Sequence, residues 1–486
     1  IDLGTSVLST MSIPEELRHS LLRTVSLGRS RLGDFELAKE GLRELIAAAT
    51  DDGERAELVQ ELVNIEINIG GFKKAEETCL AQLEVAEQLE NDKLKGAIFT
   101  DLGIATFLQG RYDDAARHFR YALGTYELLA DEAHVVSAIT NVGNALNARG
   151  DSAAAIEQWR RALEFAADSG TLSQQAKIQN NLGIAYFNLR RYAEARASYT
   201  QSRETFQRLG LKSELTYTLT NLGEVMLADG DYGGALSSWT EALDLYDMMT
   251  DSRGLVETYL QLAELRIILG DSVEPERLLA EAHRHIEADG IDTFSGSWSF
   301  WCGMLHATKG DFSSALPRLR EARALFESSG EQQKLHRCLL HIAVCTWRAG
   351  EPREAIEQLH NILAVPEGDR TPLVVAEACY VLGMIERENQ GATAEKPLAH
   401  FKAGMQLLER EPISEVTWKM TYALAREFFE RGQRERARQN LLLTEKVLRH
   451  FVSCIPTEDL RTIYLGAEGR AEVLSNIERH FRSSGE

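Results

Sequence analysis

A short motif recurs along almost the whole chain. It consists of Gly, a polar residue, usually Tyr or Phe, two variable residues and then Ala, as in Gly230-Asp231-Tyr232 with Ala235. Eleven copies can be recognised, and they begin at Gly33, Gly71, Gly110, Gly150, Arg190, Gly230, Gly270, Gly310, Gly350, Gly391 and Gly432. From position 110 to position 350 the copies are forty residues apart, and the flanking spacings are 38, 39, 41 and 41 residues. Such regularity indicates a repeat architecture in which each unit packs mainly on its neighbours.

The residues around each motif predict two helices. A small residue, usually after Leu, stands seven positions before the motif, as in Leu222-Gly223, and we place it in a helix A. After the motif, Ala235, Trp239 and Ala242 are spaced i, i+4, i+7 as on one face of a helix B. The glycine between the helices suits a tight turn that needs positive φ. The small residues inside the helices permit close packing of the pair.

These Leu-Gly, Tyr, Ala, Phe and Ala positions resemble those of the tetratricopeptide repeat family, over about residues 16–450. The period of forty differs from the usual spacing of roughly 34 in that family. The resemblance implies an all-α fold, an α-solenoid of about eleven helix-turn-helix repeats in a right-handed superhelix. Residues 1–15 would be a lead-in or the end of an upstream domain, and residues 451–486 a C-terminal capping segment with a final helix.

The composition excludes several classes of partner. A formal net charge of −21 argues against nucleic acid and against an acidic lipid surface, because both are bound mainly through Lys and Arg. No apolar run approaches the roughly 20 residues that span a bilayer. The six cysteines have no paired spacing, which favours a reducing compartment, and we expect a cytoplasmic protein. Because the first residue is Ile1 rather than Met, we expect a fragment or processed product that lacks an upstream domain.

Motifs for catalysis and cofactor binding were sought and not found. The chain contains no phosphate-binding Gly-rich loop with Lys-Ser or Lys-Thr, no His-Glu-x-x-His helix and no Gly-x-Ser-x-Gly elbow. His341 and Cys345 at i, i+4 could supply two zinc ligands, but a closed site needs four. We therefore expect neither enzymatic activity nor a bound cofactor or metal.

The face of helix A opposite the packing stripe is the candidate binding surface. When the small residue is numbered 8, positions 2, 5, 6, 9, 12 and 13 form that face, which lines the concave groove of a solenoid. Position 6 is Asn141, Asn181 and Asn221 in three successive repeats. Their amides could bind the backbone of an extended peptide. Alternatively, they bond the next helix and only space the repeats. The predicted groove residues are Thr140, Asn141, Asn144, Lys177, Asn180, Asn181, Tyr217, Thr220, Asn221, Glu224 and Trp301.

The same face becomes aromatic and basic farther along, with Phe300, Trp301 and Arg337. Trp301 is either a core residue or an anchor for an apolar side chain of a ligand. A clamp for a free C-terminal carboxylate, which the family uses, is not favoured because Lys177 is the only basic residue in the polar stretch.

We interpret the chain as a protein-interaction or effector-sensing scaffold that binds a peptide in its groove, within a bacterial signalling protein. The segment after Ile455-Pro456 supports the last point, since it is similar to the end of long repeat regions in bacterial multidomain kinases and ATP-dependent regulators. The alternatives are a solenoid that gates a kinase or nucleotide-hydrolysing domain outside this sequence, and a receptor for a small molecule.

Overall fold

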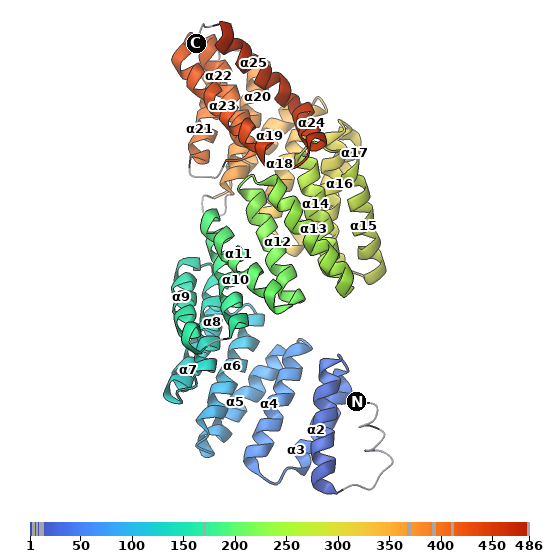
Figure 1. Cartoon of the computed structure of the whole chain (residues 1–486). Helices are drawn as coiled ribbons and strands as arrows, with labels where there is room; N and C mark the ends of the chain where they lie inside the picture. The colour runs from blue at the N-terminus through green and yellow to red at the C-terminus, as the bar shows by residue number, and fades with distance from the viewer. Residues whose placement is uncertain are drawn as a thin grey trace. The chain divides into compact units, whose positions relative to one another are not determined.

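The structure is a computed structural model that describes residues 14–169, 171–366, 371–390, 395–409 and 413–483, together with Ile1, Thr5 and Leu8. The chain is 86% helical, and the described residues contain no strand. Helices follow one another as antiparallel pairs, α2 with α3 through to α22 with α23, which gives eleven hairpins in the described part of the chain. The predicted all-α solenoid of paired helices is therefore confirmed (Figure 1).

The contacts divide the chain into two compact units, Ile1–Thr205 and Phe206–Glu486, and the boundary falls inside α11. The helices up to the boundary are α2 (Glu15–Arg31), α3 (Phe35–Ala48), α4 (Asp52–Asn68), α5 (Phe72–Gln88), α6 (Asp92–Leu108), α7 (Tyr112–Leu128), α8 (Glu132–Ala148), α9 (Ser152–Ser169), α10 (Leu172–Asn188) and α11 (Tyr192–Leu209).

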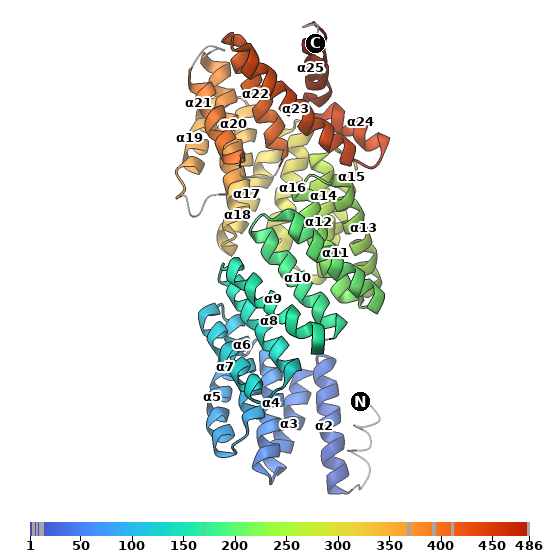
Figure 2. The ribbon, with the colours of Figure 1, turned by 60° about the vertical axis from the view of Figure 1, so that its left-hand side comes forward.

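The second unit holds six further hairpins and a C-terminal segment (Figure 2). Its elements are α12 (Lys212–Ala228), α13 (Tyr232–Met249), α14 (Ser252–Ile268), α15 (Glu274–Asp289), η1 (Asp292–Phe294), α16 (Ser295–Thr308), α17 (Phe312–Ser329), α18 (Gln332–Arg348), α19 (Pro352–Leu363), α20 (Pro372–Gln390), α21 (Glu395–Leu408), α22 (Glu415–Glu430), α23 (Arg434–Cys454), α24 (Glu458–Gly466), η3 (Ala467–Gly469) and α25 (Arg470–Ser483).

In five hairpins an aromatic side chain of helix B packs against a glycine of helix A, namely Phe119 on Gly103, Trp159 on Gly143, Tyr199 on Gly183, Trp239 on Gly223 and Phe401 on Gly383. A Cβ added to Gly143 would lie 2.4 Å from the Trp159 indole, and one added to Gly223 would lie 2.3 Å from that of Trp239. The Trp159 indole N–H also donates to the Thr140 carbonyl at 3.1 Å. The helices can approach this closely because position 8 has no side chain, as the sequence predicted.

The turn motif has two structural roles. Its glycine adopts positive φ, for example 78° at Gly230, which a residue with a Cβ rarely takes. The polar residue after it caps helix B, since the Asp231 carboxylate accepts a hydrogen bond from the Gly234 N–H at 2.9 Å. The predicted position of one turn is wrong by one residue. In the second hairpin the glycine with positive φ is Gly70, and not Gly71 as the sequence pattern indicated.

The C-terminal segment packs on its neighbour α23 and also on repeats far away in the sequence. Glu415 at the start of α22 accepts hydrogen bonds from the hydroxyls of Tyr232 on α13, at 2.8 Å, and Tyr464 on α24, at 2.9 Å. Arg470 at the start of α25 donates to Glu415 at 3.1 Å and to the Ile268 carbonyl at the end of α14 at 3.2 Å. We call Tyr232, Glu415, Tyr464 and Arg470 the clasp. It joins the first two hairpins of the second unit to its last helices.

Candidate binding pocket

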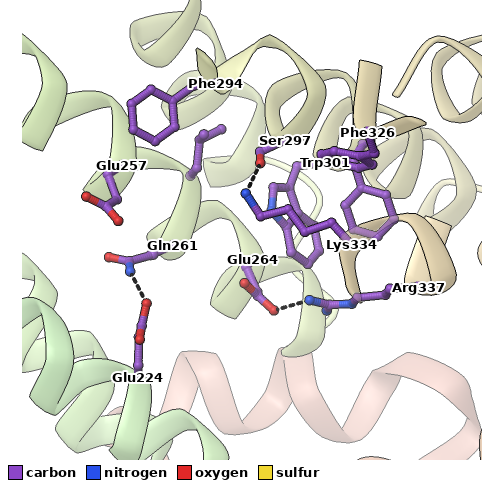
Figure 3. A pocket seen from close by; sticks show the side chains of 12 residues that line it. Glu224, Glu257, Gln261, Glu264, Phe294, Ser297, Trp301, Phe326, Lys334 and Arg337 are labelled. Carbon is purple, nitrogen blue, oxygen red and sulfur yellow. Dashed lines mark hydrogen bonds and ion pairs between the residues drawn. The ribbon is translucent and has the colours of Figure 1, made fainter. Parts of the chain in front are cut away.

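A cavity of about 190 Å³ lies in the second unit, on the face of the A helices that the sequence assigned to ligand binding (Figure 3). Four A helices and one B helix form its walls. The lining residues are Glu224 from α12; Glu257, Leu260, Gln261 and Glu264 from α14; Phe294, Ser297, Phe300 and Trp301 from η1 and α16; Phe326 from α17; and Lys334 and Arg337 from α18.

One side of the pocket is rich in hydrogen-bond acceptors. Figure 3 shows the carboxylates of Glu224 and Glu257 on this side, with the Gln261 amide between them. Gln261 Nε2 donates to Glu224 Oε1 at 2.9 Å. Burial raises the pKa of Glu224 to about 7, and the nearby carboxylates of Glu257 and Glu264 add to this rise. Burial also raises the pKa of Glu257. The wall therefore holds carboxylates at an electrostatic cost, which is typical of functional sites.

The other side carries cations on an aromatic surface. The Arg337 guanidinium lies 4.7 Å from the ring centre of Trp301 and 5.5 Å from that of Phe300. It also forms an ion pair of 2.9 Å with Glu264, which reaches it from α14. Lys334, at the rim, donates to Ser297 Oγ at 3.2 Å. The pocket thus has an apolar floor between an acidic wall and a basic wall.

The structure places the predicted groove residues in two groups. Five lie in the second unit, and of these Glu224 and Trp301 line the pocket. Tyr217 lies on α12 with 60% of its surface exposed, whereas Thr220 is buried. The other six lie on α8 and α10 of the first unit, namely Thr140, Asn141, Asn144, Lys177, Asn180 and Asn181. The predicted groove residues are therefore divided between the two units.

Some of the predicted groove side chains form hydrogen bonds within the repeat array. Asn181 Nδ2 donates to Asn144 Oδ1 at 3.0 Å, which joins position 6 of one helix A to position 9 of the preceding one. Gln261 and Glu224 occupy the same two positions. The Thr140 hydroxyl donates to the Val136 carbonyl of its own helix. Bonds between positions 6 and 9 therefore space neighbouring repeats in both units.

Several pocket residues were not among those predicted. Glu257 and Glu264 stand at positions 2 and 9 of α14, on the face that the sequence had assigned to the groove. The same rule that selected Glu224 could have found them. Phe294 and Lys334 lie before position 1 of their helices, and Phe326 comes from a B helix. No concave-face rule would select those three.

The cysteines of α18 are core residues. Cys338 is buried, and its thiol donates to the Leu319 carbonyl at 3.1 Å. Burial raises the pKa of the Cys338 thiol to about 12 and that of Cys345 to about 11. Among the residues that the structure describes, no three His, Cys, Asp or Glu side chains gather where they could hold a metal ion. None of the described helices has the length and apolar character needed to cross a bilayer.

Comparison with known proteins identifies the repeat type. Residues 135–208 match the sequence model of the tetratricopeptide repeat. No curated protein sequence matches the chain. Among solved structures, the apo form of the quorum sensor NprR from B. thuringiensis is similar, with 16% identity and a TM-score of 0.54, over 70% of this chain and 97% of NprR.

Two further structures share the fold. A Rap protein complexed with competence and sporulation factor is 12% identical, with a TM-score of 0.53, over 83% of this chain and 99% of that protein. A signal transduction ATPase with numerous domains and a tetratricopeptide repeat sensor, from Pyrococcus horikoshii, is 15% identical, with a TM-score of 0.50. That match covers 61% of this chain and 46% of the ATPase, so the chain spans less than half of its length. At these identities the likeness is one of fold.

Proposed function

We propose that this chain, a protein that carries tetratricopeptide repeats, is an interaction scaffold that senses a peptide or protein segment through the pocket of its second unit. The observation that carries the proposal is the cavity on the inner face of α12, α14, α16 and α18, where an apolar floor lies between charged walls. Pockets of this composition orient a ligand with a few polar groups and bind it through apolar contact. A quorum sensor and a Rap protein in complex with a factor have the same fold.

The size of the cavity favours a peptide over a whole small molecule. Pockets that enclose drug-sized ligands usually measure about 300–1,000 Å³. This one has about 190 Å³, which suits one or two side chains while the rest of the ligand lies outside. An extended segment that inserts one residue meets both conditions. We therefore place the small-molecule receptor second.

The chain would act by binding and not by catalysis, as the regulatory part of a bacterial signalling protein. If a kinase or nucleotide-hydrolysing domain is encoded upstream, occupation of the pocket would gate that domain. If the reading frame starts near Ile1, the chain would be a free adaptor. The upstream coding sequence distinguishes these two forms, and each leaves the pocket as the sensing site.

The experiment is a peptide selection against the whole chain followed by a pocket variant. Phe294→Ala removes a half-buried aromatic ring from the pocket wall. Because covering an aromatic side chain contributes roughly 1.5–3 kcal/mol, selected peptides should bind this variant at least ten-fold more weakly by calorimetry. Phe165→Ala, which truncates a ring that is 39% exposed in the first unit, is the matched control. Equal affinity for the wild type and Phe294→Ala would refute the pocket as the binding site.

A second contact region is proposed along the asparagine file at position 6. Asn141 and Asn181 in the first unit, and Asn221 in the second unit, would each bind peptide backbone within their own unit. Replacement of all three by Ala should weaken binding ten-fold or more, at roughly 0.5–1.5 kcal/mol for each lost hydrogen bond. Affinity and melting temperature should be measured on the same variant. Unchanged affinity with a collapsed melting temperature would identify these residues as spacers of the repeats, a role for which the Asn181–Asn144 hydrogen bond is the observed example of a contact.

A further inference from the structure

The acidic wall of the pocket, formed by Glu224, Glu257 and Gln261, contains hydrogen-bond acceptors that have no donor from the described protein. Gln261 uses its N–H on Glu224, and its buried Oε1 has no partner among the residues that the structure describes. Glu257 lies on the same side (Figure 3). Two carboxylates and an amide oxygen therefore lie on this side of the cavity, and among the described residues the hydrogen bond from Gln261 to Glu224 is the one that connects them.

The two cations that line the pocket form ion pairs with carboxylates other than Glu224 and Glu257. Arg337 pairs with Glu264 at 2.9 Å, and Lys334 pairs with Glu331 at 2.6 Å outside the lining. The third nearby cation is Arg253, an exposed residue whose guanidinium lies 5.6 Å from the ring centre of Phe294. Arg253 and Lys334 act on Glu257 only from a distance, and burial still raises the pKa of its carboxyl. Lys334 also acts on Glu224 from a distance, but no cation of the described residues forms an ion pair with Glu224 or Glu257.

Aromatic rings complete the environment. Phe294, Phe300 and Trp301 from η1 and α16 line the same cavity as Glu224 and Glu257. Ring faces and carboxylates together favour a cation with an apolar stem, since the rings cover the methylenes and attract the charge. An anionic group would meet two carboxylates that lack an ion-pair partner, and a purely apolar group would leave them desolvated.

We propose that the pocket selects a basic side chain, Lys or Arg, of the bound segment, with the cation between Glu224 and Glu257 and its stem against Phe294 and Trp301. This inference rests on the proposed function, because it names the residue that a peptide would insert. Charge complementarity also agrees with the acidity of the whole chain, whose net charge of −21 attracts basic partners.

The test uses blocked pentapeptides, acetylated and amidated, whose central residue is Lys, Arg, norleucine or Glu between varied flanks. Norleucine keeps an unbranched aliphatic stem and removes the charge. Binding to the whole chain is measured by calorimetry, with circular dichroism to verify that each variant is folded. We expect the Lys or Arg peptides to bind at least ten-fold more tightly than their norleucine counterparts, and the Glu peptides to bind most weakly.

Two double variants separate a local effect from net charge. Glu224→Gln with Glu257→Gln should reduce the preference for Lys over norleucine to less than two-fold. Glu287→Gln with Glu321→Gln changes the net charge equally, at side chains that are 70% and 49% exposed outside the pocket. This control should keep the preference.

The outcomes distinguish the two proposals. Norleucine peptides that bind as tightly as Lys peptides, and lose affinity in Phe294→Ala, would overturn the basic-residue inference and leave the pocket as the binding site. Preference for an unblocked N-terminus whatever the central residue would overturn it as well, in favour of an α-ammonium ligand. If no blocked or unblocked peptide binds the folded wild type, the proposed function fails and this inference fails with it.

Discussion

The clasp offers the sharpest test of how the second unit is held together. Glu415 accepts four hydrogen bonds: from Tyr232 at 2.8 Å, Tyr464 at 2.9 Å, Trp418 at 2.7 Å and Arg470 at 3.1 Å. The Arg470 side chain is only 2% exposed. In Glu415→Gln, an amide NH2 group replaces one carboxylate oxygen. This group cannot accept a hydrogen bond, and it would point at the N–H groups of Trp418 and Arg470 or at the tyrosine hydroxyls. The charge that balances Arg470 is also lost.

The expected magnitude follows from this burial. Removal of one partner of a buried ion pair costs roughly 3–5 kcal/mol, because the other charge remains desolvated. Glu468, which also contacts Arg470 at 3.2 Å, retains part of the compensation, so we expect about 3 kcal/mol. Long repeat arrays do not unfold in one step, so a local measurement is preferable to a global one. Amide hydrogen exchange in α24 and α25 should accelerate about 100-fold if these helices detach as a unit.

The control is an exposed ion pair that also holds α25. Arg449 on α23 contacts Glu478 on α25 at 3.2 Å, and both side chains are more than half exposed. Because exposed pairs contribute about 0–1 kcal/mol, Arg449→Gln should change exchange in α25 by less than about five-fold. The double variant of Glu415→Gln with Arg470→Met should be less destabilised than Glu415→Gln alone, since the unpaired charge is gone. Unchanged exchange in α24 and α25 of Glu415→Gln would refute the reasoning.

Two further predictions concern packing and pH. Gly223→Ala should destabilise the chain by about 1–3 kcal/mol in thermal unfolding, because its Cβ would lie 2.3 Å from the Trp239 indole. Gly124→Ala, a helical glycine with no atom near the added Cβ, should instead stabilise it by about 0.5–1 kcal/mol; equal effects of the two variants would contradict the packing account. The pKa of Glu224 is raised to about 7 from the ordinary value of 4.5, with Glu257 and Glu264 adding to the rise and Gln261 and Lys334 opposing it. The folded chain therefore holds an extra proton between about pH 4.5 and 7, and stability from this site falls as pH rises through that window. Relative to the wild type, Glu224→Gln should be more stable at pH 8 than at pH 5, by at most about 3 kcal/mol in denaturant unfolding; no difference would contradict the assigned pKa.

The repeat could be predicted from sequence because each hairpin depends on residues only a few positions apart. Gly223 and Trp239 are separated by one turn motif, and the register between them is set by helical geometry. The same motif places the left-handed glycine and the helix cap. The error at Gly71 arose where two glycines are adjacent, since both Gly70 and Gly71 permit a turn and only the hydrogen-bond register chooses between them.

The pocket could be predicted only in part. Position 9 of α12 identified Glu224, and position 6 of α16 identified Trp301, because both depend on the phase of one helix. The pairing of Arg337 with Glu264 joins α18 to α14 and passes over α16. Such a contact depends on the curvature of several stacked hairpins, which no single repeat encodes.

The contacts of the clasp could not be predicted from the repeat pattern, although two glycines in the sequence mark where the C-terminal segment packs. Position 233 is glycine inside helix α13, where no positive φ requires one, and a Cβ there would lie 2.7 Å from the Cys454 carbonyl. A Cβ on Gly270 would likewise lie 2.3 Å from Ala467. These two glycines allow close approach of Cys454 and Ala467, so the C-terminal segment packs on more than the last hairpin.

The clasp and the pocket are linked through charges in the interior of the second unit. Lys419 pairs with Glu468 at 2.9 Å, and Glu468 also contacts Arg470 of the clasp. The positive charges of Lys419 and Arg337 both act on the carboxyl of Glu377, and Arg337 belongs to the pocket wall. Detachment of α25 would remove Arg470 from this chain of charges and leave Lys419 as the ion-pair partner of Glu468. Because Lys419 and Arg337 act on the same carboxyl, we infer that a change at the clasp alters the charge balance at the pocket wall.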